Sequence, residues 1–82
     1  MNIFVSNLNF KVTDETLRQL FEEYGDVLSA AVIKDRTTRL SKGFGFVEMY
    51  SDKDGEEAIK QLDQKHFHGK VLHVSVAKQR TV

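Results

Sequence analysis

The octapeptide Lys42-Gly43-Phe44-Gly45-Phe46-Val47-Glu48-Met49 has the residue alternation of a β-strand. Successive side chains of a strand point to opposite faces of its sheet. Phe44 and Phe46 therefore lie on one face. Lys42 and Glu48 share that face with them. The other face carries only glycine, valine and methionine, and it can be buried against a core.

Aromatic rings on the open face of a strand need a physical explanation. Leaving one ring exposed forgoes about 1.5–3 kcal/mol of burial. A flat surface on which nucleic-acid bases stack is one explanation. The alternative is that a partner protein or a third helix covers Phe4, Phe44 and Phe46. The chain leaves only a stub at residues 78–82 for such a helix.

The remaining pattern predicts three more strands and two helices. Strands are expected over residues 3–8, 27–34, 42–50 and 71–77, with a hairpin loop at 35–41 and a connector at 63–70. Thr13 and either Ser51 or Asp52 are candidate N-caps of the helices, and Gly25 is expected at the C′ position of the first. The core-facing residues expected in the helices are Leu17, Leu20, Phe21, Tyr24, Ala58, Ile59 and Leu62.

This order of elements predicts an α+β fold, the ferredoxin-like βαββαβ sandwich. Right-handed crossovers place two helices on one face of a four-stranded antiparallel sheet and leave the other face open. Residues 1–82 are expected to form a single domain with a short C-terminal tail at 78–82. Gly55 is expected to allow close packing of the second helix on the sheet.

The composition excludes several classes of protein. The chain has 82 residues, of which 40% are hydrophobic and 29% charged, as in a soluble globular domain. It has no cysteine, so a disulfide, a thiolate metal site and a thiol nucleophile are excluded. Residues 1–6 enter an alternating run at once, so no signal peptide or membrane span is expected, and a cytoplasmic location follows.

The net charge is zero, but acids and bases are separated along the chain. Residues 14–26 and 52–63 each hold five acids, whereas bases dominate residues 34–42 and 65–80. If the acidic segments are helices and the basic segments border the sheet, the two charges lie on opposite faces. A polyanionic partner on the sheet is therefore compatible with zero net charge.

The octapeptide and the hexapeptide Ile3-Phe4-Val5-Ser6-Asn7-Leu8 together resemble the two signature motifs of the RNA recognition motif family. The octapeptide has the family's order of a basic residue, glycine, an aromatic, glycine, an aromatic and an aliphatic. The motifs lie about forty residues apart, and the likeness extends over nearly the whole chain. Three departures are Met49 in place of an aromatic, Arg39 in place of a loop glycine, and Asp63-Gln64 in place of Asn-Gly.

The resemblance implies roles for individual residues. Phe4 and Phe46 would each stack under a base, and Phe44 would lie between adjacent sugars. Lys42 would neutralise a phosphate, and Glu48 is expected near a base amino group. Further RNA-binding residues are expected to be Lys34, Arg36, His73, Ser75, Lys78, Gln79 and Arg80.

Simpler roles for some of these residues stay open. The cations at positions 34, 36 and 39 are alternatively only a solvated loop. His73 and Ser75 either read base edges or leave room for bases. Three other phenylalanines, Phe10, Phe21 and Phe67, are expected in the core. The pair His66 and His68 is expected on the connector surface and not at a metal.

The sequence argues against catalysis. Acylphosphatases share the expected architecture, but they need a glycine-rich anion cradle after the first strand, and residues 6–10 contain no glycine. No nucleophile, base and orienting group form a recognisable set.

The sequence therefore predicts a non-enzymatic, monomeric module without cofactor or metal. It would bind short single-stranded RNA, or alternatively single-stranded DNA, with modest sequence preference and no small-molecule substrate. The resemblance extends to short single-motif bacterial proteins, with a role in post-transcriptional RNA handling.

Overall fold

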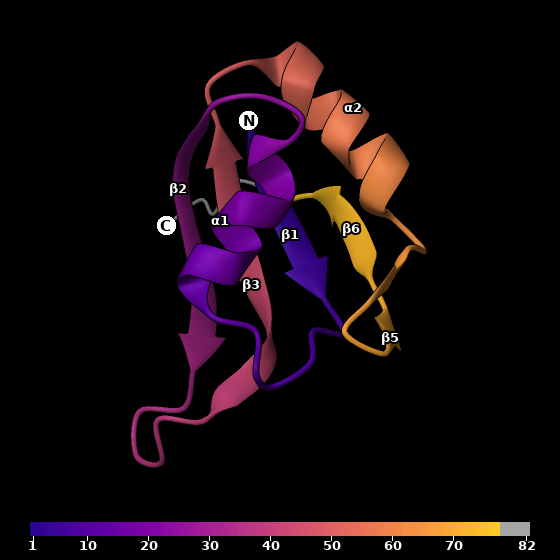
Figure 1. Cartoon of the computed structure of the whole chain (residues 1–82). Coiled ribbons are helices and arrows are strands. Elements are labelled where there is room, and N and C mark those ends of the chain that lie inside the picture. Colours follow the sequence, from indigo (N-terminus) through magenta and orange to yellow (C-terminus); the bar gives the residue numbers. More distant parts are fainter. Residues whose placement is uncertain (78–82) are drawn as a thin grey trace.

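Two helices cover one face of a four-stranded antiparallel sheet in the computed structural model of the chain, which describes residues 1–77 (Figure 1). The sheet has the strand order β2-β3-β1-β6. Its strands are β1 (Asn2–Ser6), β2 (Val27–Lys34), β3 (Ser41–Met49) and β6 (His73–Val76). The helices are α1 (Asp14–Glu22) and α2 (Asp52–Leu62). The predicted ferredoxin-like arrangement is confirmed.

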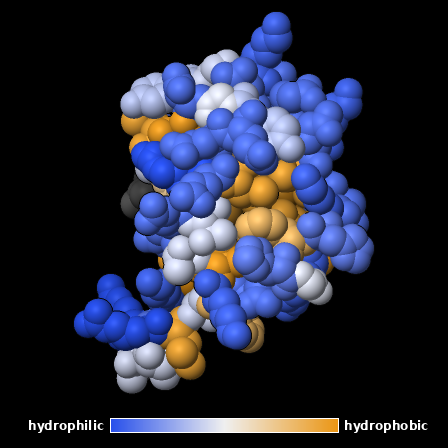
Figure 2. All heavy atoms as spheres, in the orientation of Figure 1, coloured by the Kyte–Doolittle hydropathy of each residue, from blue (hydrophilic) through white to orange (hydrophobic). Residues whose placement is uncertain are grey.

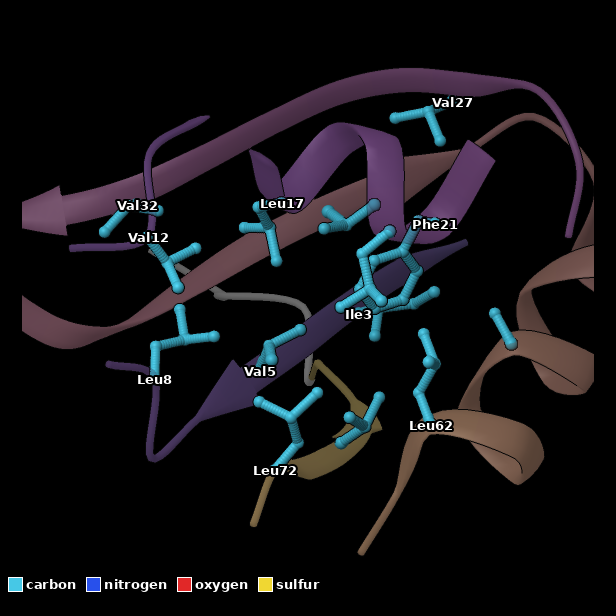
Figure 3. Close-up of a cluster of buried hydrophobic side chains, with 14 of the residues drawn as sticks. Ile3, Val5, Leu8, Val12, Leu17, Phe21, Val27, Val32, Leu62 and Leu72 are labelled. Atoms are coloured by element: carbon cyan, nitrogen blue, oxygen red, sulfur yellow. The ribbon is translucent and has the colours of Figure 1, made fainter. Parts of the chain in front are cut away.

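The hydrophobic core lies between the helices and the inner face of the sheet (Figure 3). Ile3 and Val5 of β1 alternate with Phe4, and both are fully buried. Leu17 and Phe21 of α1 pack into the same cluster, as the helical spacing predicts. Every buried side chain of the core among residues 1–77 is apolar. The inward-facing side chains of the strands, spaced by two residues, therefore pack against the apolar stripes of the helices in one core layer.

Both predicted helix N-caps are present. The Thr13 hydroxyl oxygen accepts a hydrogen bond from the Thr16 N–H at 3.2 Å, and the Ser51 hydroxyl accepts one from Asp54 at 3.3 Å. A cap of this kind contributes about 1 kcal/mol. Gly25 differs from its predicted place, because α1 ends with Glu23 as the C-cap and the glycine lies two residues further on. Its φ of 153° and the Asp54 side chain beside it leave no room for a Cβ.

The C-terminal part of the fold contains a break that the alternation pattern did not predict. Residues 63–70 were expected to be a connector, but they include β4 (His66–Phe67), which pairs with β5 (Lys70–Val71) in a separate hairpin. The expected strand 71–77 is therefore split at Leu72. The Gln64 N–H donates to the Leu72 carbonyl, and the Leu72 N–H donates to the Lys65 carbonyl. These two backbone hydrogen bonds fix Leu72 between β5 and β6.

Both edges of the sheet are partly closed by a carboxylate from the helical layer. Asp14 accepts the Val32 N–H of edge strand β2 at 2.7 Å, and Asp63 accepts the Val74 N–H of edge strand β6 at 2.9 Å. An unpaired edge N–H can recruit another strand, so these contacts limit edge-to-edge association. Val76 at the end of β6 is 56% exposed, whereas Val74, two residues earlier on the same strand, is buried.

The charges separate between the two layers as expected. The acids of α1 and α2 lie on the helical face, which Figure 2 shows as mostly hydrophilic. The basic segment 34–42 forms the end of β2, the hairpin loop and the start of β3. No helix within residues 1–77 is long and apolar enough to cross a membrane.

Two glycines test how tightly the layers fit. A methyl group on Gly45 of β3 would lie 2.5 Å from the backbone carbonyl oxygen of Ala31 and 3.1 Å from the Leu17 side chain. A methyl group on Gly55 of α2 would instead meet the flexible side chain of Met1. The tight contact at Gly55 is thus with the residue before β1 and not, as expected, with the sheet itself.

We expect Gly45→Ala to lower the free energy of unfolding by about 1–3 kcal/mol, because a strand backbone cannot move aside. Gly55→Ala is the matched control and should lie within about 1 kcal/mol of wild type, since the helix gains propensity and Met1 can rotate away. Urea unfolding followed by circular dichroism measures both. Equal stability of the two variants would contradict the tight β2–β3–α1 packing.

Candidate functional site

Three phenylalanine rings form a cluster on the sheet face opposite the helices. Phe4 lies directly across the β1–β3 ladder from Phe46, and their ring centroids are 5.3 Å apart. The Phe44 centroid is 5.7 Å from Phe4 and 6.4 Å from Phe46, with an edge-on contact to the latter. The predicted sharing of one face by these rings is confirmed. We call this set of three residues the aromatic cluster.

The aromatic cluster is accessible to a ligand. Phe46 is 38% exposed, and the other two rings are half-buried because the three rings cover one another. Both helices pack on the opposite face, and no element within residues 1–77 lies over the rings. Within residues 1–77 no third helix covers the rings, and the stub at 78–82 lies outside the described residues.

Mostly small side chains of the neighbouring strands pair with the rings across the sheet. Along one row, Ala31 of β2 pairs with Phe46, and Ser75 of β6 pairs with Phe4. In the next row, Ser6 of β1 pairs with Phe44 on one side and with His73 on the other. Because none of these neighbours is bulky except the histidine, a planar ligand can approach the rings from above.

His73 is oriented by Gln64, one of the residues that depart from the family pattern. Its Nδ1 lies 3.2 Å from the Gln64 side-chain nitrogen. An amide nitrogen only donates, so this contact makes Nδ1 the acceptor and leaves the proton of the neutral imidazole on Nε2. Gln64 itself has a φ of 69° and is held by a hydrogen bond from its N–H to the Leu72 carbonyl. His73 therefore presents an N–H donor beside the aromatic cluster.

The β2–β3 hairpin loop carries a group of exposed cations. Lys34, Arg36, Arg39 and Lys42 are all exposed. Asp35 organises the loop, because its Oδ1 accepts the N–H groups of Thr37 at 2.8 Å and Thr38 at 3.0 Å. Those two backbone donors, that of Thr38 first, lower the pKa of the Asp35 carboxyl below its ordinary value.

Arg39 adopts a φ of 63°, in the left-handed region that glycine favours. The replacement of the usual loop glycine therefore keeps the turn conformation at some backbone strain and adds a cation. Lys78, Gln79 and Arg80 lie outside the described residues.

Phe10 was expected in the core, and that prediction is wrong. Its side chain is 68% exposed in the loop between β1 and α1, whereas Phe21 is buried and Phe67 is half-buried against the core. The sequence does contain a signal for this. Phe10 stands between Asn9 and Lys11, outside the alternation of the strand and before the N-cap of the helix, so no apolar stripe includes it.

Comparison with known proteins identifies a family. The family profile described as the RNA recognition motif matches residues 3–73. RbpB of the cyanobacterium Nostoc sp., which is named for RNA binding, is 45% identical over 98% of this chain and 78% of its own length. The expected resemblance to short bacterial proteins of this family is confirmed. The chain spans only 25% and 34% of the chloroplastic ribonucleoproteins of Nicotiana sylvestris and Spinacia oleracea that it matches.

Solved structures agree with the fold. The crystal structure of RNA-binding protein PG1 has a TM-score of 0.95 and 48% identity, with 100% of this chain and 99% of that chain covered. A complex described as Sxl-lethal protein with RNA has a TM-score of 0.92 and 32% identity, and the match covers 98% of this chain and 48% of that one.

The lowered pKa of Asp35 predicts how the stability of the fold depends on pH. Because its pKa is lowered in the folded protein, the ionised group contributes stability at neutral pH that is lost as pH falls through the lowered pKa. Asp35→Asn keeps an acceptor oxygen without the charge, so its stability deficit relative to wild type should shrink in acid. Thermal unfolding from pH 7 to pH 2 measures this, and carboxyl NMR reports the Asp35 titration directly. If Asp35→Asn is less stable than wild type by the same amount at every pH in that range, the lowered pKa of Asp35 is contradicted.

Proposed function

The chain belongs to the RNA recognition motif family, and from this premise we propose that it binds short single-stranded RNA on the open face of its sheet. The observation that supports this most strongly is the aromatic cluster. The ring centroids of Phe4, Phe44 and Phe46 lie no more than 6.4 Å apart, on the face that the helices leave open. Stacking platforms of this kind are how such sheets bind unpaired bases. The match to a solved complex with RNA supports the same ligand class.

Stacking supplies the base-independent part of the affinity. In the proposal, one base stacks on Phe4 and a neighbouring base on Phe46, with Phe44 beneath the sugars between them. Each stacked base contributes about 1–3 kcal/mol, because every base has an aromatic face. Ala31 and Ser75 flank these two rings and leave room for the bases. Affinity from two or three stacked bases is then about micromolar at best.

Cations around the β2–β3 hairpin supply contacts to phosphates in the proposal. In the proposal, Lys42 at the start of β3 holds one phosphate, and Lys34 and Arg36 hold others from the hairpin loop. The Asp35 hydrogen bonds support this role, since an ordered loop loses less conformational entropy on binding than a mobile one. The residues after the last strand that complete the proposed contact set are Lys78, Gln79 and Arg80.

Polar groups on the open face supply modest base selectivity. His73 offers its Nε2–H as a donor to a base edge, and the hydroxyl of Ser75 beside the aromatic cluster can donate or accept. Glu48 lies one row from the rings, opposite Asn2, and can accept from a base amino group but not from a phosphate. Few such groups are present, so stacking outweighs base reading in the proposed interface.

The proposal describes a binding module and not an enzyme. Residues 1–82 act as a single domain in the cytoplasm, with a role in the handling of RNA after transcription. The relatives named for RNA binding support a non-catalytic role. Single-stranded DNA is the alternative ligand, and a comparison of RNA and DNA of equal sequence distinguishes the two through the 2′-hydroxyl contacts.

We expect Phe4→Ala and Phe46→Ala each to weaken RNA binding by about 1–3 kcal/mol. Thermal stability should change little, because both rings lie outside the core. Fluorescence anisotropy with labelled short RNAs measures the affinity. Phe46→Tyr keeps an aromatic face and is the matched control, so it should bind as wild type does.

Wild-type affinity in both alanine variants would reject the stacking proposal. The rival reading, a protein-binding sheet, is tested by an NMR titration with the same RNA. Shifts confined to the helices, with a silent sheet, would favour that rival.

The salt dependence of binding should report the phosphate contacts. With two to four contacts, the slope of log affinity against log salt concentration is expected to be about −1.4 to −2.8. Lys42→Gln should reduce the magnitude of the slope by about 0.7. Lys53→Gln removes an exposed lysine of α2 on the helical layer and should leave the slope unchanged. A flat salt response in wild type would contradict the phosphate contacts.

A further inference from the structure

A second aromatic surface lies beside the aromatic cluster. The exposed ring of Phe10 borders a shallow hollow where β1 ends and β3 begins, and the same hollow is lined by Ser6, Lys42, Phe44 and Lys70. Phe44 thus belongs both to the aromatic cluster and to the wall of this hollow. A chain lying over the cluster reaches Phe10 without crossing another element of the fold.

The loop that carries Phe10 is held in place by its neighbours. The Asn7 side-chain amide donates to the Val71 carbonyl at 2.7 Å, and the Asn9 amide donates to the His68 carbonyl at 3.0 Å. Both acceptors belong to the β4–β5 hairpin or its turn. Asn9 Oδ1 also accepts the Lys11 N–H at 2.9 Å, which closes a tight turn around Phe10.

Asn7 has a φ of 61°, a conformation that asparagine tolerates better than most residues. The loop is therefore ordered before any ligand arrives, and its order keeps Phe10 away from the core.

The ring of Phe10 lies against the strand that carries the octapeptide. A methyl group built on Gly43 would be 3.3 Å from the Phe10 Cε1, so the absent side chain lets the ring edge approach β3. Gly43 also has a φ of 83°, which only glycine adopts readily. The close approach of Phe10 to β3 therefore depends on a glycine of the motif itself.

Two cations stand beside this ring. The Lys70 ammonium lies 5.6 Å from the Phe10 ring centroid, within range of a cation–π contact, and Lys42 lines the same hollow. An aromatic ring flanked by lysines matches the two parts of a nucleotide, a flat base and an anionic phosphate. An acidic or purely apolar ligand would match only one of the two.

We propose that Phe10, Lys42 and Lys70 form an additional nucleotide subsite, continuous with the aromatic cluster. The base of one further nucleotide stacks on Phe10, and its phosphate lies near the two ammonium groups. This inference rests on the proposed binding of single-stranded RNA and specifies where the strand leaves the sheet. The ordered loop makes the subsite ready for binding, because its conformational entropy is already lost.

The test compares fluorescein-labelled oligouridylates of four and eight nucleotides by anisotropy. Phe10→Ala should weaken binding of the 8-mer about 5- to 50-fold, since one stacked base is lost, and binding of the 4-mer by less than twofold. Phe10→Tyr keeps the ring and should bind both lengths as wild type does. Lys70→Gln should weaken the 8-mer selectively, whereas Lys53→Gln, which removes an exposed lysine of α2, should change neither.

Two outcomes would overturn the subsite. Unchanged 8-mer affinity in Phe10→Ala would show that the ring contacts no nucleotide, as expected if it docks a protein instead. An equal loss for both lengths would show a general disturbance of the sheet and not a separate subsite. Failure of the proposed function is distinguishable from both, because Phe46→Ala would then bind both lengths as tightly as wild type.

Discussion

The register between β1 and β3 is the constraint on which the rest of the structure depends. Ile3 faces Val47 on the inner side of this ladder, and Phe4 faces Phe46 on the outer side. One pairing therefore sets both the core and the aromatic cluster. Because side chains alternate with a period of two, a slip of one residue would bury the rings and expose the aliphatic side chains. The hydrophobic effect that stabilises the fold thus also holds the aromatic cluster on the opposite face.

The glycines of the octapeptide extend this constraint to the neighbouring elements. Gly45 lets β2 and α1 approach the centre of β3, and Gly43 lets the Phe10 loop approach its beginning. Both fill positions where a Cβ would meet atoms of another element. The glycines are thus as necessary as the aromatics, since they decide how close the helical layer and the loop can come to the binding face.

Polar side chains mainly order backbone segments around the site. Asp35 closes the hairpin loop, Asn7 and Asn9 fix the loop after β1, and Gln64 orients His73. None of these groups is fully buried, so each arrangement depends on hydrogen bonds and not on core packing. The aromatic cluster is in this way surrounded by segments that are already in place, which reduces the entropy lost on binding. The acidic side chains of α1 and α2 lie on the helical layer, away from a polyanion on the sheet.

The sequence by itself determined the order of the elements, the helix N-caps, the buried stripes and the outward direction of Phe4, Phe44 and Phe46. All of these depend on periodicity or on contacts within a few residues, which a linear sequence displays directly. The break at Leu72, the exposure of Phe10 and the orientation of His73 were decided only by the tertiary structure. Each depends on hydrogen bonds that no periodicity of the sequence displays, from the contact between Gln64 and His73, nine residues apart, to that between Asn7 and Val71, 64 residues apart. Phe10 lies outside every apolar stripe of the sequence, and the contacts that hold its loop place the ring at the surface.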